Sequence, residues 1–330
     1  MCSVAFFRVR RMRKVKIKAY GKVNLTLEIV GAKDGYHLLD SLVASVDLFD
    51  LVVLTKRKDK LSRVVMKGLG SESIPPERNN ALKAAEAFSA RFGVNGADIT
   101  IYRNIPVGAG LGSSSADIAG VLNGMAKLYG VEEKESIAEI ADGLGSDARY
   151  MLTGGFARMQ GRGERVTPLP IDTKLYMLLL CPKTGVSAGE CYKEYDALHA
   201  ENDNLGTPGA LSTTENCIRA LADGRENDVG RYLMNDLYLP ATRLNGDVKK
   251  AYDEAQAFSP TGAVMTGSGS CVLATFATKE LCEWAKSRYR GKFRTYVVQT
   301  VTPNKGKNTD EWQNPFALSE TEQALFDEKN

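Results

Sequence analysis

One stretch of the chain decides the fold: Pro106-Val107-Gly108-Ala109-Gly110-Leu111-Gly112-Ser113-Ser114-Ser115. It lies between a predicted strand at 98–102 and a predicted amphipathic helix at 113–129. Glycines let the backbone turn its N–H groups toward a ligand, and the start of a helix adds partial positive charge. The serine hydroxyls add further donors, so the stretch is typical of a polyphosphate site. A tight turn capped by serine is the alternative interpretation.

Better-known phosphate-binding patterns do not fit this loop. The sequence has no G-x-x-x-x-G-K-[ST], which excludes a Walker-type loop. The dinucleotide pattern needs a third glycine where Ser113 stands, and the polar turn Arg103-Asn104 separates the strand from the loop. Neither H-R-D nor D-F-G follows, which excludes the protein-kinase set. The sequence therefore predicts a distinct glycine/serine phosphate loop.

Two further glycine clusters are less specific. Thr266-Gly267-Ser268-Gly269-Ser270 follows a helical stretch at 248–258 and enters a predicted strand at 271–276. We interpret it either as a helix-to-strand turn or as a second wall of the phosphate site. Gly154-Gly155 and Gly161-Arg162-Gly163-Glu164 together predict a hairpin with a structural role.

The composition of the 330 residues excludes several classes of protein. Lys plus Arg number 43 against 40 for Asp plus Glu, and a net charge of +3 gives no case for nucleic-acid or membrane binding. The sequence has no apolar run near the ~18 residues of a membrane span. Six scattered cysteines without a C-x-x-C pair, and two histidines, argue against a disulfide framework or a zinc site. We therefore expect reduced thiols, no metal-ligating set and a cytoplasmic location.

The order of the predicted elements favours an α+β fold over a doubly wound sheet, because strands outnumber the short βαβ repeats. Prolines at 168 and 170 predict a boundary between two domains, 1–168 and 169–302, followed by a polar tail at 303–330. Predicted strands cover 14–19, 24–30, 42–46, 50–55, 98–102 and 175–181, and predicted helices cover 79–92, 113–129 and 134–143.

Three motifs of the chain resemble those of the GHMP family of small-molecule kinases: the loop at 106–115, the early Lys22-Val23-Asn24-Leu25 and the late stretch 265–270. Within the family, the intact Asp34-Gly35-Tyr36-His37 resembles the members that act on 4-diphosphocytidyl-2-C-methyl-D-erythritol. The resemblance covers nearly the whole chain apart from both ends. The D-G-Y-H element is specific, whereas the loop alone identifies only the superfamily.

Some positions depart from the pattern of those members. The loop has Ser113 and Ser114 where they usually have glycine, Tyr20-Gly21 stands in place of Pro-Ala, and Ala188 replaces a threonine. These differences bear on the substrate more than on the kinase activity. A GHMP kinase for another small alcohol, such as homoserine or a mevalonate-like acid, therefore stays open as an alternative. The second open alternative is a nucleotide-binding protein without catalytic activity.

The resemblance implies a two-domain fold with the nucleotide and substrate site in the cleft between the domains. It implies an enzyme that uses ATP and Mg²⁺ to phosphorylate the 2-hydroxyl of the cytidine-diphosphate polyol, in the methylerythritol phosphate route to isoprenoid precursors. Asp147 matches the family's catalytic base, and Lys22 matches the lysine that orients it. From the residues alone, Asp147 is equally explained as a helix cap and Lys22 as a solvated surface charge.

The resemblance also implies the binding residues. ATP is expected against all ten residues of the loop at 106–115 and against Asn80 and Arg103. The rings of Tyr36 and Tyr192 are expected to stack on cytosine, His37 to read the edge of the base, and Asn24 to bind the polyol.

Asp117 follows the loop, and we expect it in the first turn of the helix, where its charge complements the helix dipole. The expected partner is a small molecule, with no nucleic acid and no membrane, and the expected protein is a monomer or homodimer.

Overall fold

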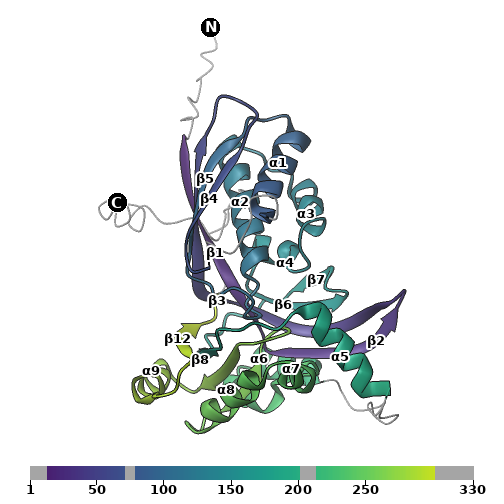
Figure 1. Ribbon diagram of the computed structural model, residues 1–330, viewed down its shortest axis with the longest axis vertical. Coiled ribbons are helices and arrows are strands. Elements are labelled where there is room, and N and C mark those ends of the chain that lie inside the picture. The colour runs from purple at the N-terminus through teal and green to yellow at the C-terminus, as the bar shows by residue number, and fades with distance from the viewer. Residues whose placement is uncertain (1–12, 71–78, 201–212, 302–330) are drawn as a thin grey trace.

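The computed structural model describes residues 13–70, 79–200 and 213–301, which form two β-sheets with helices packed against them (Figure 1). The predicted α+β class is confirmed. The polar tail at 303–330 lies outside the described residues. The larger sheet contains β1 (Lys14–Asn24), β2 (Thr26–Lys33), β3 (Tyr36–Lys56), β4 (Arg63–Gly68), β5 (Ala97–Arg103), β6 (Phe156–Gly161), β7 (Arg165–Pro168) and β9 (Met234–Asn235). The smaller sheet has the order β10 (Gly262–Met265), β11 (Val272–Phe276), β8 (Tyr176–Cys181) and β12 (Arg294–Gln299).

The helices lie in two groups. Figure 1 shows α1, α2 and α3 along one side of the larger sheet, and α8 and α9 beside the smaller sheet. None of the described helices is long and apolar enough to span a membrane. The helices are α1 (Asn80–Phe92), α2 (Ser113–Tyr129), α3 (Lys134–Asp142), α4 (Ala148–Thr153), α5 (Ala188–Ala200), α6 (Thr213–Ala222), α7 (Tyr238–Leu244), α8 (Gly246–Gln256) and α9 (Lys279–Arg288), with a 3-10 turn at Glu226–Tyr232.

The long strand β3 organises the larger sheet. The sequence predicts two strands, 42–46 and 50–55, and this separation is wrong because β3 runs unbroken for 21 residues. The polar break at Asp47 does not end the strand, because partners hold it on both sides. β1 follows β3 in antiparallel register with one shift between Tyr20 and Lys22, and Asp47 accepts a hydrogen bond from the Gln299 amide at 2.9 Å.

Helix α2 packs directly on the larger sheet. Its bounds are those predicted from sequence, and almost every residue after its first turn is buried. A Cβ at Gly120 would lie 2.8 Å from Val52 and 2.9 Å from Ala19, so only glycine allows this close approach. The phosphate loop therefore enters a helix that is fixed against the strands.

The two halves of the chain share one hydrophobic core. Residues of the smaller sheet, among them Leu179 and Leu273, belong to the same buried cluster as Ile17 and Leu122 of the first half. β9, from the second half, also pairs in parallel with β2. The division at residue 168 remains a prediction, but the packing fixes the two halves against each other.

The five cysteines among the described residues are all free and buried.

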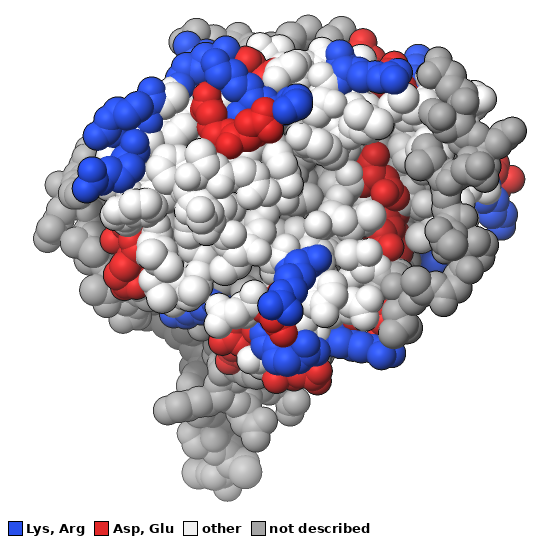
Figure 2. Space-filling view, turned by 90° about the horizontal axis from the view of Figure 1, so that it is seen from below, with Lys and Arg blue, Asp and Glu red and all other residues white. Residues whose placement is uncertain are grey.

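On the face seen in Figure 2, positive and negative side chains are interspersed around a largely uncharged area. This face therefore carries no extended patch of one sign of the kind that nucleic acid needs.

Candidate active site

Lys22 lies at the meeting point of the motifs that sequence reasoning singled out. It follows the register shift in β1, and its amide donates to the carbonyl of Leu111 in the phosphate loop at 3.0 Å. Its Nζ donates to Asn24 Oδ1 at 2.5 Å and lies 3.4 Å from Asp147 Oδ2. The side chain is only 6% exposed, so the interpretation of Lys22 as a solvated surface charge is wrong.

Asn24 positions that ammonium group. Its Oδ1 accepts from Lys22, and its Nδ2 donates to Ser41 Oγ at 2.8 Å. Both ends of the amide therefore have protein partners. Asn24 therefore fixes the position of the Lys22 ammonium group.

Asp147 occupies the N-cap position of α4, as the structural alternative expects. Its carboxylate, however, turns toward Lys22 and remains one-quarter exposed. A partly exposed carboxylate beside a buried ammonium has the geometry of a base that accepts a proton from a bound hydroxyl.

The phosphate loop has the backbone conformation that its glycines predict. Gly108, Gly110 and Gly112 have φ of 66°, 74° and 71°, in the left-handed region. Gly112 is the N-cap of α2 and brings no side chain to cap it, and the first helical bond runs from the Ala116 amide to the Gly112 carbonyl. The preceding amides, from Ser113 to Ser115, therefore point out of the helix end, where an anion is favoured. This cradle fits a polyphosphate.

The second glycine cluster packs against the first. The strand β10 precedes it, so the predicted helix-to-strand turn is wrong; four residues of strand are too short to show in the sequence. The amide of Cys271 donates to the carbonyl of Ala109 at 3.2 Å, and Thr266 Oγ1 accepts from the Asn24 amide at 2.8 Å. Asn235 donates to the carbonyls of Met265 and Gly267 at 2.7 and 2.8 Å. The loop is therefore a second wall, bonded to the phosphate loop and to β1.

A buried charged cluster supports the phosphate loop from within the fold. The guanidinium of Arg103, 1% exposed, donates from Nη2 to Ser113 Oγ at 2.7 Å. It lies 3.5 Å from the carboxylate of Asp117 and 4.0 Å from that of Asp50. Burial raises the pKa of both carboxyl groups, and the charge of Asp50 raises that of Asp117 further.

This cluster changes two expectations. Asp117 is the fifth residue of α2, just beyond the expected first turn, and it pairs with Arg103 instead of complementing the helix end. Arg103 touches the loop through Ser113 and faces away from solvent, so it supports the nucleotide loop rather than lining an open adenosine site. Sequence reasoning missed Asp50, whose carboxylate accepts from the Asn104 and Ile105 amides at 2.6 and 2.8 Å. Asn80, the other expected adenosine residue, opens α1, and Asn79 caps that helix.

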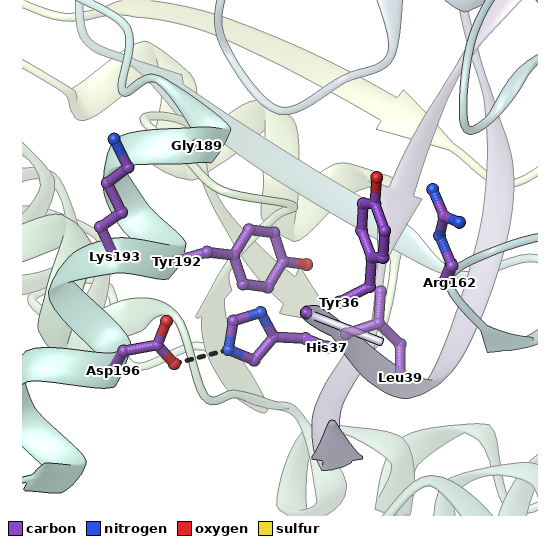
Figure 3. Close-up of a pocket in the computed structure, with 9 residues that line it drawn as sticks. Tyr36, His37, Leu39, Arg162, Gly189, Tyr192, Lys193 and Asp196 are labelled. Atoms are coloured by element: carbon purple, nitrogen blue, oxygen red, sulfur yellow. Dashed lines mark hydrogen bonds and ion pairs between the residues drawn. The ribbon is translucent and has the colours of Figure 1, made fainter. Parts of the chain in front are cut away.

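An aromatic pocket of about 360 Å³ lies between the tip of the β2–β3 hairpin and α5 (Figure 3). Tyr36 and His37 come from the hairpin, and Tyr192 from the helix. The rings of His37 and Tyr192 are stacked with centroids 4.8 Å apart. Burial raises the pKa of Tyr192, and the charge of Asp147 raises it further.

Three charged residues that line the pocket, Arg162, Lys193 and Asp196, were not expected. The guanidinium of Arg162 lies 3.5 Å from the centroid of the half-exposed Tyr36 ring, and His37 Nε2 lies 2.7 Å from Asp196 Oδ1. The sequence showed Arg162 only as part of a hairpin. One feature of the sequence could have pointed to Asp196: it lies four residues after Tyr192 on a helix, so the two side chains share a face.

Comparison with known proteins gives one consistent result. The GHMP kinases N terminal domain matches residues 79–157, and the GHMP kinases C terminal domain matches residues 217–292. A 4-diphosphocytidyl-2-C-methyl-D-erythritol kinase of Carboxydothermus hydrogenoformans is 36% identical over 281 residues, covering 83% of this chain and 91% of that protein. The kinase of the same name from Caldicellulosiruptor saccharolyticus is 31% identical over 299 residues, covering 89% and 99%.

Solved structures agree with this result. A crystal structure of 4-(cytidine 5'-diphospho)-2C-methyl-D-erythritol kinase superposes with a TM-score of 0.70 at 28% identity, covering 86% of this chain and 98% of that one. The L. major mevalonate kinase in complex with R-mevalonate superposes at 0.67 with 15% identity, covering 88% and 98%, which shows a shared fold alone. The chain therefore belongs to the GHMP kinases, the ATP-dependent kinases of small molecules.

Proposed function

We propose that this chain transfers the γ-phosphoryl group of ATP to the 2-hydroxyl of 4-diphosphocytidyl-2-C-methyl-D-erythritol, a step toward isoprenoid precursors. One observation carries the proposal: the Lys22–Asp147 pair, 3.4 Å apart, lies at the part of β1 to which both glycine loops are bonded. The curated relatives that bear the name of this kinase support the choice of substrate.

Asp147 and Lys22 have different roles in the proposed phosphoryl transfer. Asp147 accepts the proton of the attacking hydroxyl, an effect of about 10²–10⁴-fold in rate. Lys22, held by Asn24, keeps the carboxylate oriented and stabilises the negative charge that develops on the hydroxyl oxygen. The pair is largely buried, which strengthens these interactions relative to water.

The nucleotide phosphates fit the loop amides from Gly108 to Ser115. This fit rests on the three left-handed glycines and on the open N-terminus of α2. Across the described residues, His, Cys, Asp and Glu form no group of three or more that could hold a metal ion. Mg²⁺ bound to the nucleotide would neutralise phosphate charge there.

The aromatic pocket suits a pyrimidine base. Tyr36 and Tyr192 offer ring faces for stacking, and His37 offers a polar edge between them. The free thiols and the small-molecule chemistry accord with a cytoplasmic enzyme that acts as a monomer or homodimer.

An ATP-consumption assay over a panel of alcohols tests the proposal. The panel contains the cytidylylated polyol, homoserine and mevalonate. We expect turnover on the cytidylylated polyol only. Turnover on another alcohol would assign a different GHMP kinase activity, and ATP binding without any turnover would indicate a silent nucleotide-binding protein.

The role of Asp147 is tested in the same assay. Asp147→Asn should lower kcat by about 10²–10⁴-fold while the KM for ATP stays within about threefold, because the amide cannot accept the proton. Asp142→Asn is the control, since Asp142 pairs with Arg149 on the surface at 2.7 Å. Unchanged turnover of Asp147→Asn would remove the assignment.

A further inference from the structure

The contact between His37 and Asp196 determines which ring nitrogen of the histidine carries hydrogen. His37 Nε2 lies 2.7 Å from Asp196 Oδ1, and Tyr192, one helical turn earlier on α5, stacks on the same ring. A carboxylate only accepts hydrogen bonds, so the hydrogen must be on Nε2. In the neutral imidazole, Nδ1 then has a free lone pair and is an acceptor.

The acceptor lies on the edge of the ring that is turned away from Asp196 (Figure 3). Figure 3 shows the second ring nitrogen of His37 on the edge toward Tyr192, away from Asp196. Within the part of the chain that the structure describes, no hydrogen bond occupies it. A base that enters the pocket would therefore meet an acceptor at this edge.

An acceptor distinguishes the two pyrimidines. Cytosine carries a 4-amino group, which donates, whereas uracil carries a 4-oxygen, which only accepts. Arg162 and Lys193, which also line the pocket, only donate, so they cannot accept from the 4-amino group of cytosine and do not favour it over the 4-oxygen of uracil.

We propose that Asp196 is a specificity-determining positioning residue, which fixes the Nε2–H tautomer of His37 so that the pocket accepts cytosine and rejects uracil. This inference rests on the proposed function, since it concerns the base of the same substrate. Asp196 is 62% exposed, so the contact adds little to the stability of the fold. Asp196 instead determines whether His37 Nδ1 accepts or donates in its hydrogen bond with the base.

The variant Asp196→Asn tests the direction of that bond. The asparagine amide can accept from Nε2 through its oxygen or donate to it through its nitrogen, so the hydrogen is no longer held on Nε2, and a donor can form at the edge that reads the base. Asp196→Ala removes the partner of Nε2 altogether. In both variants we expect kcat/KM for the cytidine substrate to fall by about tenfold, mainly through KM, while the uridine analogue keeps or gains activity.

A matched control lies two residues earlier on the same helix. Glu194 carries the same charge but pairs with Arg243 at 3.2 Å. Glu194→Gln should therefore keep the cytidine-to-uridine ratio of the unchanged protein. His37→Phe keeps a ring beside Tyr192 but has no acceptor, so adding Asp196→Asn to it should change the ratio no further. A further drop in the double variant would mean that Asp196 contacts the base directly, and would overturn the proposal.

Nitrogen NMR of labelled histidine reads the tautomer without any turnover. The chain has two histidines, and the second provides an internal reference. His199 Nδ1 lies 2.8 Å from the Tyr195 carbonyl, an acceptor, so His199 carries hydrogen on Nδ1. We expect opposite tautomers for His37 and His199 in the unchanged protein, and a mixture of tautomers for His37 alone in Asp196→Ala.

The outcomes separate this inference from the proposed function. An unaltered cytidine-to-uridine ratio in Asp196→Ala, or hydrogen on His37 Nδ1 in the unchanged protein, would overturn the role of Asp196. Absence of turnover on the cytidylylated polyol would instead refute the proposed function. The NMR measurement would still decide whether Asp196 fixes the tautomer.

Discussion

Replacing Gly110 by alanine tests whether the two glycine loops form one unit. The new Cβ would lie 2.0 Å from the carbonyl oxygen of Thr266, where an ordinary contact begins at 3.4 Å. Both atoms belong to backbone, so a rotamer change cannot relieve the clash. The loops must move apart by about 1 Å, the scale at which phosphoryl-transfer geometry is lost.

The magnitude follows from the bonds at this junction. An alanine at φ of 74° costs about 1–2 kcal/mol in backbone strain. Separation also strains three hydrogen bonds: Cys271 amide to Ala109 carbonyl, Thr266 hydroxyl to Gly110 carbonyl, and Asn24 amide to Thr266 hydroxyl. At about 1 kcal/mol each, the total loss in the free energy of unfolding is about 4–5 kcal/mol.

Gly108→Ala is the matched control. Gly108 has a φ of 66°, so it carries the same backbone strain, but its Cβ would lie 3.5 Å from Gly185, an ordinary contact. We expect a loss of only about 1–2 kcal/mol. Urea unfolding of both variants without nucleotide measures the difference, and kcat/KM of Gly110→Ala should fall by about 10²-fold. Equal stabilities of the two variants would refute the idea that the loops are joined at Gly110.

The remaining predictions concern the buried cluster below the loop. Arg103→Met leaves Asp50 and Asp117 without their cation and should cost about 3–5 kcal/mol in urea unfolding. Adding Asp117→Asn should recover part of this loss, because a neutral amide needs no cation, and no recovery would contradict the pairing. The third prediction concerns pH. Because burial raises the folded-state pKa of Asp117, the stability that its protonation contributes is present below its unfolded pKa and is lost as the pH rises through the folded value. Asp117→Asn should remove this loss, so its stability relative to the unchanged protein should increase from about pH 4 upward, as unfolding at a series of pH values would measure. A constant difference would show that Asp117 keeps its ordinary pKa.

The sequence predicted correctly those helices whose bounds depend on neighbouring residues, such as an apolar period or a capping residue. Helix α2 was placed at its observed bounds because its apolar period is strong and glycine precedes it. Helix α1 was placed within one residue, since the predicted first residue, Asn79, is its cap. β3 was divided in error, because neighbouring strands and the Asp47–Gln299 contact carry it through a polar break. Tertiary pairing of this kind has no local signal.

Some residues of the candidate site were likewise predicted from the sequence, and others were not. The motifs pointed to Lys22 and Asp147, and the fold brings these two side chains together. The cluster of Asp50, Arg103 and Asp117 was not predicted, because spacing along the chain does not show which charges are buried together. The same limit applies to Asp196, which looks like a solvated helix residue until the hairpin is placed beside it.

Strand β3 connects two ends of the candidate site. His37 lies near its start, and Ser41, four residues on, bonds to Asn24, which in turn holds Lys22. Four residues of extended chain span about 13 Å. Under the proposed function, this continuous backbone would set the separation between the edge that reads the base and the lysine at the reacting hydroxyl. We therefore expect the enzyme to discriminate against cytidine compounds with a shorter spacer as well as against alcohols without the base.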